Sequence, residues 1–251
     1  MDLPPIELEK DPAPPPLKDS VAFQPTVEEV LASVAQDLTL QATACVREFG
    51  SFHLAVSGGV GMGLGLLERL CRELMTDPAY RMLPWRDTHV WTVDEAPVAL
   101  QDPKSVYGVL RDLIIGHSGI PREQVHGMSA FRPAADTEYE KRLQRELGRR
   151  RAGHDRLDMV VLALGADGVA GRLPEERADE PQRLAVRLED QSVTLTRRML
   201  AGSRFMGVLA IGKDVSPVLQ QVSAGAIRPV PNLLAGHTRW YVDHDAGLDG
   251  A

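Results

Sequence analysis

The chain has 251 residues, of which 43% are hydrophobic and 25% charged, and its formal net charge is −7 at pH 7. This length and composition fit a globular protein of one large domain or two small ones. The negative charge excludes a chain-wide basic face, so we expect no nucleic-acid binding and no binding to anionic membranes. No stretch approaches the roughly 20 apolar residues that span a bilayer, and the proline-rich start is not a secretory signal. A cytoplasmic location is therefore predicted.

The first 24 residues are predicted to form a flexible, proline-rich arm. The segment "MDLPPIELEKDPAPPPLKD" (1–19) contains six prolines, which remove backbone donors and favour extended conformations. A disordered tail is the simpler interpretation, and a docking peptide for a protein partner is the functional one. Residues 25–251 are predicted to form the folded domain.

From Thr26 onward, helix-like and strand-like patterns alternate along the chain. Helices are expected within 27–49, 64–77, 105–117, 136–151 and 216–225, and strands within 52–59, 88–97, 157–168, 204–214 and 238–246, with a short apolar-periodic piece at 192–203. Gly50 is a typical helix stop. Strands that alternate with helices indicate an α/β fold with a mostly parallel sheet and helices on both faces.

Ligands in such folds bind beyond the carboxyl ends of the strands, which points to the turns at 57–63, 94–97 and 165–169. "SGGVGMG" (57–63) precedes a helix, so its backbone N–H groups favour phosphate binding about as much as a ligand-free tight turn. It is neither a Walker loop nor a dinucleotide fingerprint. A nucleophile elbow at Ser57 has little support, because it would lie on the first strand.

Asp94 and Glu95 end the second strand. Carboxylates at this place can act as a general base, ligate a metal or cap the next segment. No histidine or third carboxylate recurs at ligand spacing, so no metal is expected. No cofactor is expected either.

Two other features are interpreted as structural. The basic run "EKRLQRELGRRR" (140–151) pairs glutamate with arginine at helical spacing, as a solvated helix face does. Cys45 and Cys71 lie in apolar helical patterns without a CxxC partner, so buried, unreactive thiols in a reducing compartment are expected.

Taken together, the strand-end turns resemble the 6-phosphogluconolactonase family, within the wider group that includes glucosamine-6-phosphate isomerases. The likeness is strongest to the lactonase half of bifunctional hexose-6-phosphate dehydrogenase. It runs from about Thr26 to Ala246. The matching pieces are "HLAVSGG", "WRDTHVWTVDEAPVALQDPKSVYG", "IPREQVHGM", "LDMVVLALGADG", "VLAIGKD" and "RWYVDHDA". The resemblance implies a Rossmann-like sheet and an ancestry in hydrolysis of 6-phosphogluconolactone, in the pentose phosphate pathway.

The sequence departs from the family pattern at polar positions that face the ligand. The hydroxyls of the family's SGGST loop are missing from Ser57-Gly58-Gly59-Val60-Gly61, and the histidine of its DGH motif, expected to act as acid–base catalyst, is Val169. Four further positions also differ: Ala96 and Ser192 replace arginines, Val106 replaces an amide, and Val215 replaces a lysine, with Lys213 two residues earlier.

Two hypotheses follow from these losses. In the favoured one, the chain is a catalytically inactive or strongly weakened homologue that binds either a protein partner, with the arm as the docking segment, or a sugar phosphate. The alternative is an active 6-phosphogluconolactonase with substitute residues. The expected site comprises the catalytic remnants Asp94, Glu95 and Asp167 and the ligand-binding residues Ser57, Gly58, Gly59, Gly61, Tyr107, Arg172 and Lys213.

Overall fold

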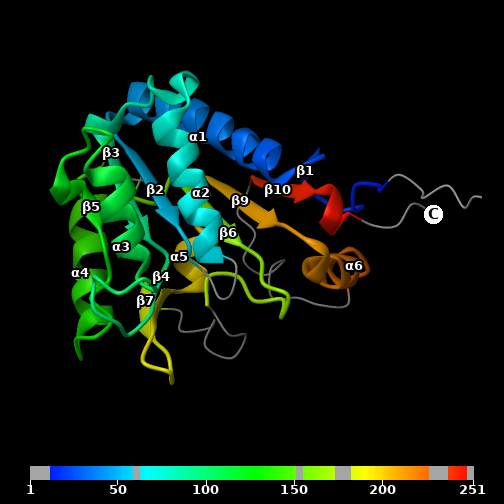
Figure 1. The fold of residues 1–251 in the computed structure, drawn as a ribbon. Coiled ribbons are helices and arrows are strands. Elements are labelled where there is room, and N and C mark those ends of the chain that lie inside the picture. The colour runs from blue at the N-terminus through cyan, green and yellow to red at the C-terminus, as the bar shows by residue number, and fades with distance from the viewer. Residues whose placement is uncertain (1–11, 59–62, 151–154, 173–181, 226–236, 248–251) are drawn as a thin grey trace, which may run out of the picture.

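A parallel seven-stranded sheet forms the centre of the molecule (Figure 1). The computed structural model describes residues 12–58, 63–150, 155–172, 182–225 and 237–247. The strand order is β1-β10-β9-β6-β2-β3-β5, and every pairing is parallel. The strands are β1 (Ser20–Gln24), β2 (Phe52–Val56), β3 (Thr88–Thr92), β5 (Val125–His126), β6 (Met159–Ala163), β9 (Phe205–Ala210) and β10 (Thr238–Asp243).

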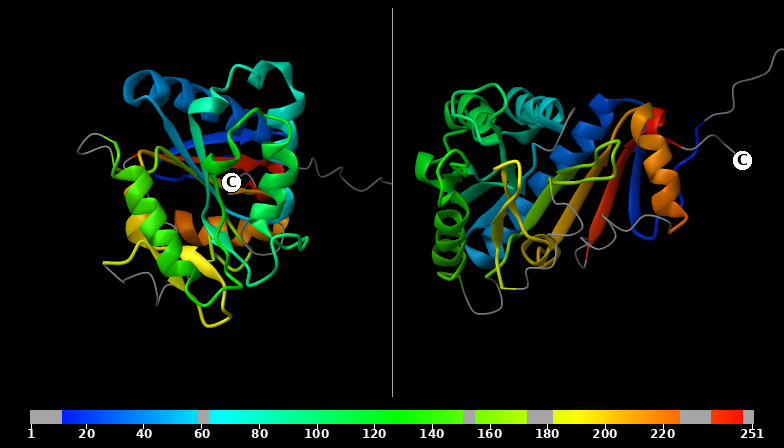
Figure 2. Two further views of the ribbon diagram at one scale, coloured as in Figure 1. Left: turned by 90° about the vertical axis from the view of Figure 1, so that its left-hand side faces the viewer. Right: turned by 90° about the horizontal axis from the view of Figure 1, so that it is seen from below.

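Helices cover both faces of this sheet, as the alternating pattern predicts. Successive sheet residues enter different apolar clusters: Leu54 packs with α1, α2 and α3, whereas Ala55 packs with α4, α5 and α6. In the left view of Figure 2, the blue helix α1 and the orange helix α6 lie on opposite sides of the strands. The helices are α1 (Val27–Phe49), α2 (Gly63–Thr76), α3 (Val106–Leu110), α4 (Ala135–Leu147), α5 (Arg197–Ala201) and α6 (Ser216–Ser223). A π-helical turn, Arg111–Ile115, extends α3.

The first long helix shows why the sequence pattern was informative. Thr26 and Glu29 form a capping box at its start, and Gly50 ends it with φ of +76°, a conformation that glycine adopts without strain. The two cysteines are buried in α1 and α2, and burial raises the pKa of each thiol to about 12. Both thiols are therefore protonated and unreactive at neutral pH, as predicted.

The end of the predicted arm belongs to the sheet instead. Residues 20–24 form β1, which pairs with β10 from Ser20↔Arg239 to Gln24↔Asp243. Ala22 is buried, and Leu17 packs against the core. The predicted boundary after residue 24 was therefore wrong for this stretch, because five residues beside prolines show too little alternation to be recognised as a strand. Residues 1–11 of the arm lie outside the described residues.

A small antiparallel sheet, which the sequence pattern does not reveal, joins the carboxyl edge of the main sheet. It consists of β4 (Asp94–Glu95), β8 (Val193–Leu195) and β7 (Ala185–Arg187). The piece at 192–203 accordingly divides into β8 and α5. This small sheet places the residues around Ser192 beside Asp94 and Glu95.

Three histidines stack beneath α4. The His53 and His89 rings are stacked at 4.5 Å, Trp91 covers His126 at 3.7 Å, and the Trp91 indole N–H donates to His53 Nδ1 at 3.2 Å. Burial is the main cause that lowers the pKa of His53 to about 2 and of His126 to about 3. These rings are therefore neutral at physiological pH.

This burial predicts a loss of stability in acid. Both pKa values lie below the ~6.5 of an unfolded histidine, so below that pH the unfolded chain binds more protons than the folded one. The free energy of unfolding should fall by up to about 1.4 kcal/mol per pH unit for each histidine between pH ~6.5 and ~4. Urea unfolding at pH 6.5 and at pH 5.5 measures this fall in the free energy of unfolding. Between these two pH values, the fall should be about 1 kcal/mol smaller in His126→Gln than in the native chain.

An independent readout does not depend on the variant's stability. Histidine C2–H resonances of the native chain should show His53 and His126 still neutral at pH 5. A midpoint near 6.5 for either ring would contradict the structure.

Candidate ligand site at the carboxyl edge of the sheet

The carboxyl ends of β2, β3 and β6 meet at one edge, as the fold requires. There the chain brings together Ser57 after β2, Asp94 and Glu95 after β3, and the turn around Asp167 after β6. Gly58 is also in place, whereas Gly59 and Gly61 of the glycine loop lie outside the described residues. The described residues of the three predicted turns thus lie at one edge of the sheet.

Asp94 is one of two buried carboxylates that accept several hydrogen bonds at this site. Its side chain is fully buried, and its Oδ1 accepts hydrogen bonds from the Ser57 hydroxyl at 2.6 Å and the Gly58 N–H at 3.1 Å. Its Oδ2 accepts from Arg172 Nε at 3.1 Å. Asp94 therefore anchors the first residues of the glycine loop to the end of β3.

Arg172 reaches the site from the turn after β6. Its side chain is 23% exposed, and its Nη1 lies 3.9 Å from Asp190 Oδ2 in the β7–β8 connection. Its φ of +54° is unusual for a residue with a side chain and costs about 1 kcal/mol. The sequence named Arg172 without locating it, and the structure places its guanidinium on the buried carboxylate.

Glu95 serves the start of α3. Its carboxylate accepts from the Val106 and Tyr107 N–H groups, each at 2.9 Å, and from the Ser105 hydroxyl at 3.2 Å. Burial raises the pKa of Glu95 to about 7, although these three donors favour the charged form. Ser105 is a site residue that the sequence reasoning missed, although a serine followed by an apolar run is a helix-cap signal.

The turn around Asp167 keeps its shape without a histidine. Asp167 is exposed, and its Oδ1 accepts from the Val169 N–H at 3.0 Å. Gly168 adopts φ of +78°, and a bridge between Leu164 and Ala170 closes the turn. The half-buried side chain of Val169 takes no part in these bonds, so they do not require a histidine at this position.

Val106 packs directly on the glycine loop. A Cβ on Gly58 would lie only 2.3 Å from Val106 Cγ2, which shows how closely the valine approaches the loop backbone. Val106 is 3% exposed. An apolar side chain thus occupies the position where the resemblance expects an amide.

Tyr107 joins this group through its backbone N–H, whereas Lys213 makes no hydrogen bond to it within the described residues. Lys213 is exposed, and Val215, two residues on, is buried in the core behind α6. The Tyr107 ring lies against Gly127, where an added Cβ would approach it to 2.4 Å. Buried Ser192 donates its hydroxyl to Asp190 within the β7–β8 connection.

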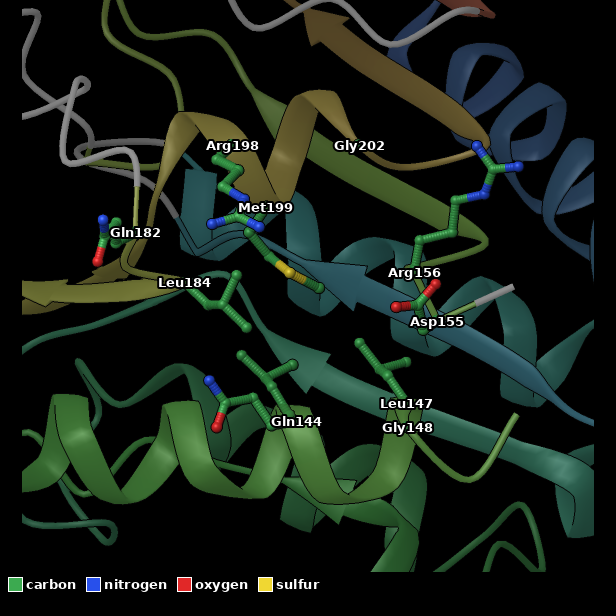
Figure 3. A pocket seen from close by; sticks show the side chains of 11 residues that line it. Gln144, Leu147, Gly148, Asp155, Arg156, Gln182, Leu184, Arg198, Met199 and Gly202 are labelled. Carbon is green, nitrogen blue, oxygen red and sulfur yellow. The ribbon is translucent and has the colours of Figure 1, made fainter. Parts of the chain in front are cut away.

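A separate hollow of about 350 Å³ lies between the end of α4 and α5 (Figure 3). Leu147, Leu184 and Met199 project into it, while Asp155 and Arg156 lie on its exposed rim. None of the predicted site residues lines this hollow. It is therefore distinct from the group around Asp94.

Within the described ranges, no group of three or more histidine, cysteine, aspartate or glutamate side chains is arranged to hold a metal ion. In the same part of the chain, no helix combines the length and apolar character needed to cross a membrane.

The family model described as glucosamine-6-phosphate isomerases/6-phosphogluconolactonase matches residues 25–240, and the chain belongs to this family. The human GDH/6PGL endoplasmic bifunctional protein is 28% identical over 237 residues, which cover 88% of this chain and 29% of that protein. The chain thus spans less than a third of that relative's length. The name places the human protein in the endoplasmic reticulum, and a cytoplasmic location for this chain stays a prediction.

Shorter relatives are covered almost entirely. A 6-phosphogluconolactonase of Aggregatibacter actinomycetemcomitans is 26% identical over 235 residues, with 88% of this chain and 96% of that protein covered. The crystal structure of 6-phosphogluconolactonase from Thermotoga maritima matches with a TM-score of 0.74 and 20% identity, over 90% of this chain and all of that one. That likeness shows the fold.

The ion pair between Arg172 and Asp94 predicts a measurable cost. Arg172→Gln should lower the free energy of unfolding by about 1–3 kcal/mol, because Asp94 stays buried with fewer donors. Arg172→Gly loses the same ion pair but relieves the positive φ, so it should be about 1 kcal/mol more stable than Arg172→Gln. Urea unfolding of the two variants at pH 7.5 checks both predictions. If Arg172→Gln is as stable as the native chain, the ion pair with Asp94 does not stabilise the fold.

Proposed function

We propose that this chain is a catalytically disabled or strongly weakened member of the 6-phosphogluconolactonase family that acts through binding. The observation that carries the proposal is Val169, which stands where the resemblance expects the acid–base histidine. The turn around it is closed by a hydrogen bond and a β-bridge, while the side chain at position 169 can neither donate nor accept a proton.

Two of the three retained carboxylates, Asp94 and Glu95, are committed to other partners. Hydrolysis of a lactone needs a base that can reach water and donors that stabilise charge on the carbonyl oxygen. Asp94 is paired with Arg172, and Glu95 is turned toward the N–H groups of α3. Loss of the base costs about 10²–10⁴ in rate, and loss of one charge-stabilising donor costs about 10²–10³.

The binding role rests on what the edge of the sheet still offers. The glycine-rich segment leads into α2, whose N-terminus favours an anion. The partly exposed Arg172 guanidinium is bonded to Asp94, which also binds the Gly58 N–H. A sugar phosphate is therefore the small ligand that we propose. Asp94 offsets the charge of Arg172, so binding should be weak. A protein partner docked through the proline-rich arm remains part of the proposal.

An active lactonase is the second candidate, and one observation favours it. Asp167 is exposed and only one of its oxygens is used by the turn, so its other oxygen could activate water. The bacterial relative carries the name 6-phosphogluconolactonase. Lactones also hydrolyse spontaneously, which lowers the catalytic demand.

The two candidates differ in one assay. Hydrolysis of freshly generated 6-phosphogluconolactone, corrected for the spontaneous rate, should show no turnover by the native chain at micromolar concentration. Turnover that Asp167→Ala abolishes would overturn the proposal and support the active lactonase.

Val169→His is the companion variant. Recovery of turnover in this variant would show that the anion site still holds substrate and that the missing histidine was the limiting loss. If neither protein turns over, binding of 6-phosphogluconate by the native chain but not by Arg172→Gln is the expected result. Absence of 6-phosphogluconate binding in both would exclude the sugar-phosphate role and leave the protein partner.

A further inference from the structure

The basic run of the sequence forms one wall of a pocket on the opposite side of β3 from α1 and α2. This pocket of about 570 Å³ lies between α4, the edge strand β5 and the 3₁₀ turn Arg122–Gln124. Its lining comprises His89, Glu123, Gln124, Val125, His126, Arg142, Arg145, Glu146 and Arg149. None of these residues belongs to the group around Asp94.

This pocket contains more arginines than acidic residues. Glu146 accepts from Arg145 at 2.9 Å and from Arg149 at 2.7 Å, so one carboxylate is shared by two guanidinium groups. Arg142 is half-buried and makes no hydrogen bond or ion pair within the described ranges. The other acid, Glu123, is exposed at the rim. With both histidines neutral, three arginines face two glutamates, and the pocket is cationic.

Two imidazoles complete the lining. His89 Nδ1 and His126 Nε2 lie 3.0 Å apart, so one of them donates to the other. Whichever ring donates, one of the two remaining ring nitrogens carries a proton and the other carries a lone pair. A single added proton makes both of these nitrogens donors. The stack with Trp91 and His53 holds the rings in position.

We propose that this pocket binds a small dianion of the phosphate-monoester class, at a site separate from the glycine loop. Guanidinium groups match the geometry of phosphate oxygens, and charge-assisted hydrogen bonds of this kind are the strong ones. Arg142 supplies the uncommitted cation, and the imidazole pair supplies one neutral donor. The volume suits a ligand of small-molecule size.

Proton uptake strengthens this site in mild acid. His126 is surrounded by His89, Arg142 and Arg145, and burial followed by these groups lowers its pKa to about 3. Burial is the main cause that lowers the pKa of His89; Glu146 opposes this shift, and Arg150 and Arg149 add to it. Neighbouring His53 is neutral, and Glu123 lies across the pocket. A bound dianion offsets the arginines and raises both histidine pKa values, so binding takes up protons.

The test is a calorimetric titration with sodium sulfate, a dianion whose charge is constant between pH 6.0 and 7.5. Arg142→Gln should weaken sulfate binding at least about tenfold, whereas Lys141→Gln, an equal charge change on an exposed neighbour in α4, should leave it unchanged. Glu123→Gln should tighten it about two- to threefold. Binding to the native chain should be about threefold tighter at pH 6.0, and His89→Gln should lose this gain.

Other outcomes overturn the proposal. Equal weakening by Arg142→Gln and Lys141→Gln would mean diffuse attraction to a basic helix face, and no measurable sulfate binding would exclude the site. Loss of sulfate binding in Arg172→Gln alone would place the anion at the glycine loop instead. The lactonase assay does not enter this test, so failure of either proposal leaves the other standing. Replacing sulfate by inorganic phosphate at pH 7.5 should give the same order of variants.

Discussion

The carboxyl edge of the sheet depends on the buried carboxylate of Asp94. A charged group that is fully removed from water is stable only when its oxygens are hydrogen-bonded and its charge is paired. Asp94 meets both conditions with three partners from two segments: Ser57 and Gly58 after β2, and Arg172 after β6. This one group therefore joins the glycine loop, β4 and the Asp167 turn. The unusual backbone of Arg172 is stable because the ion pair offsets its strain.

Local bonding likewise explains how the turn after β6 is held with a valine at position 169. The turn after β6 is closed by backbone hydrogen bonds, a glycine with positive φ and the Asp167 carboxylate. Glu95 is retained for the N–H groups of α3. These residues are needed by the fold whether or not the protein is a catalyst. Position 169 carries no such constraint, and its substitution costs the fold little.

A second polar region, the stack of His53, His89 and His126, lies beneath α4. Strand β3 links it to the group around Asp94. The Tyr139 hydroxyl donates to the carbonyl oxygens of Thr92, at the end of β3, and His126. Two residues after Thr92 comes Asp94. Strand β3 therefore links the histidine stack to the segment that carries the carboxylates, and the Tyr139 hydroxyl binds α4 to the end of that strand.

The sequence alone determined the alternation of strands and helices, the parallel sheet and the three turns that meet at its edge. These features follow from local rules of apolar periodicity, helix caps and glycine turns, and from the common carboxyl edge of parallel strands. It also determined the loss of the histidine, because residue identity at a recognised motif needs no coordinates. It missed β1, β7 and Ser105, whose signals are short or ambiguous.

Only the tertiary structure decided which charges meet. Arg172 is separated from Asp94 by 78 positions, and the arginines of α4 reach the histidines only because α4 packs on β3 and β5. The basic run at 140–151 reads as a solvated helix face because sequence spacing shows neighbours on one helix and nothing of what lies opposite. Pairing, burial and the pKa of a group depend on that opposite surface, which the folded chain alone supplies.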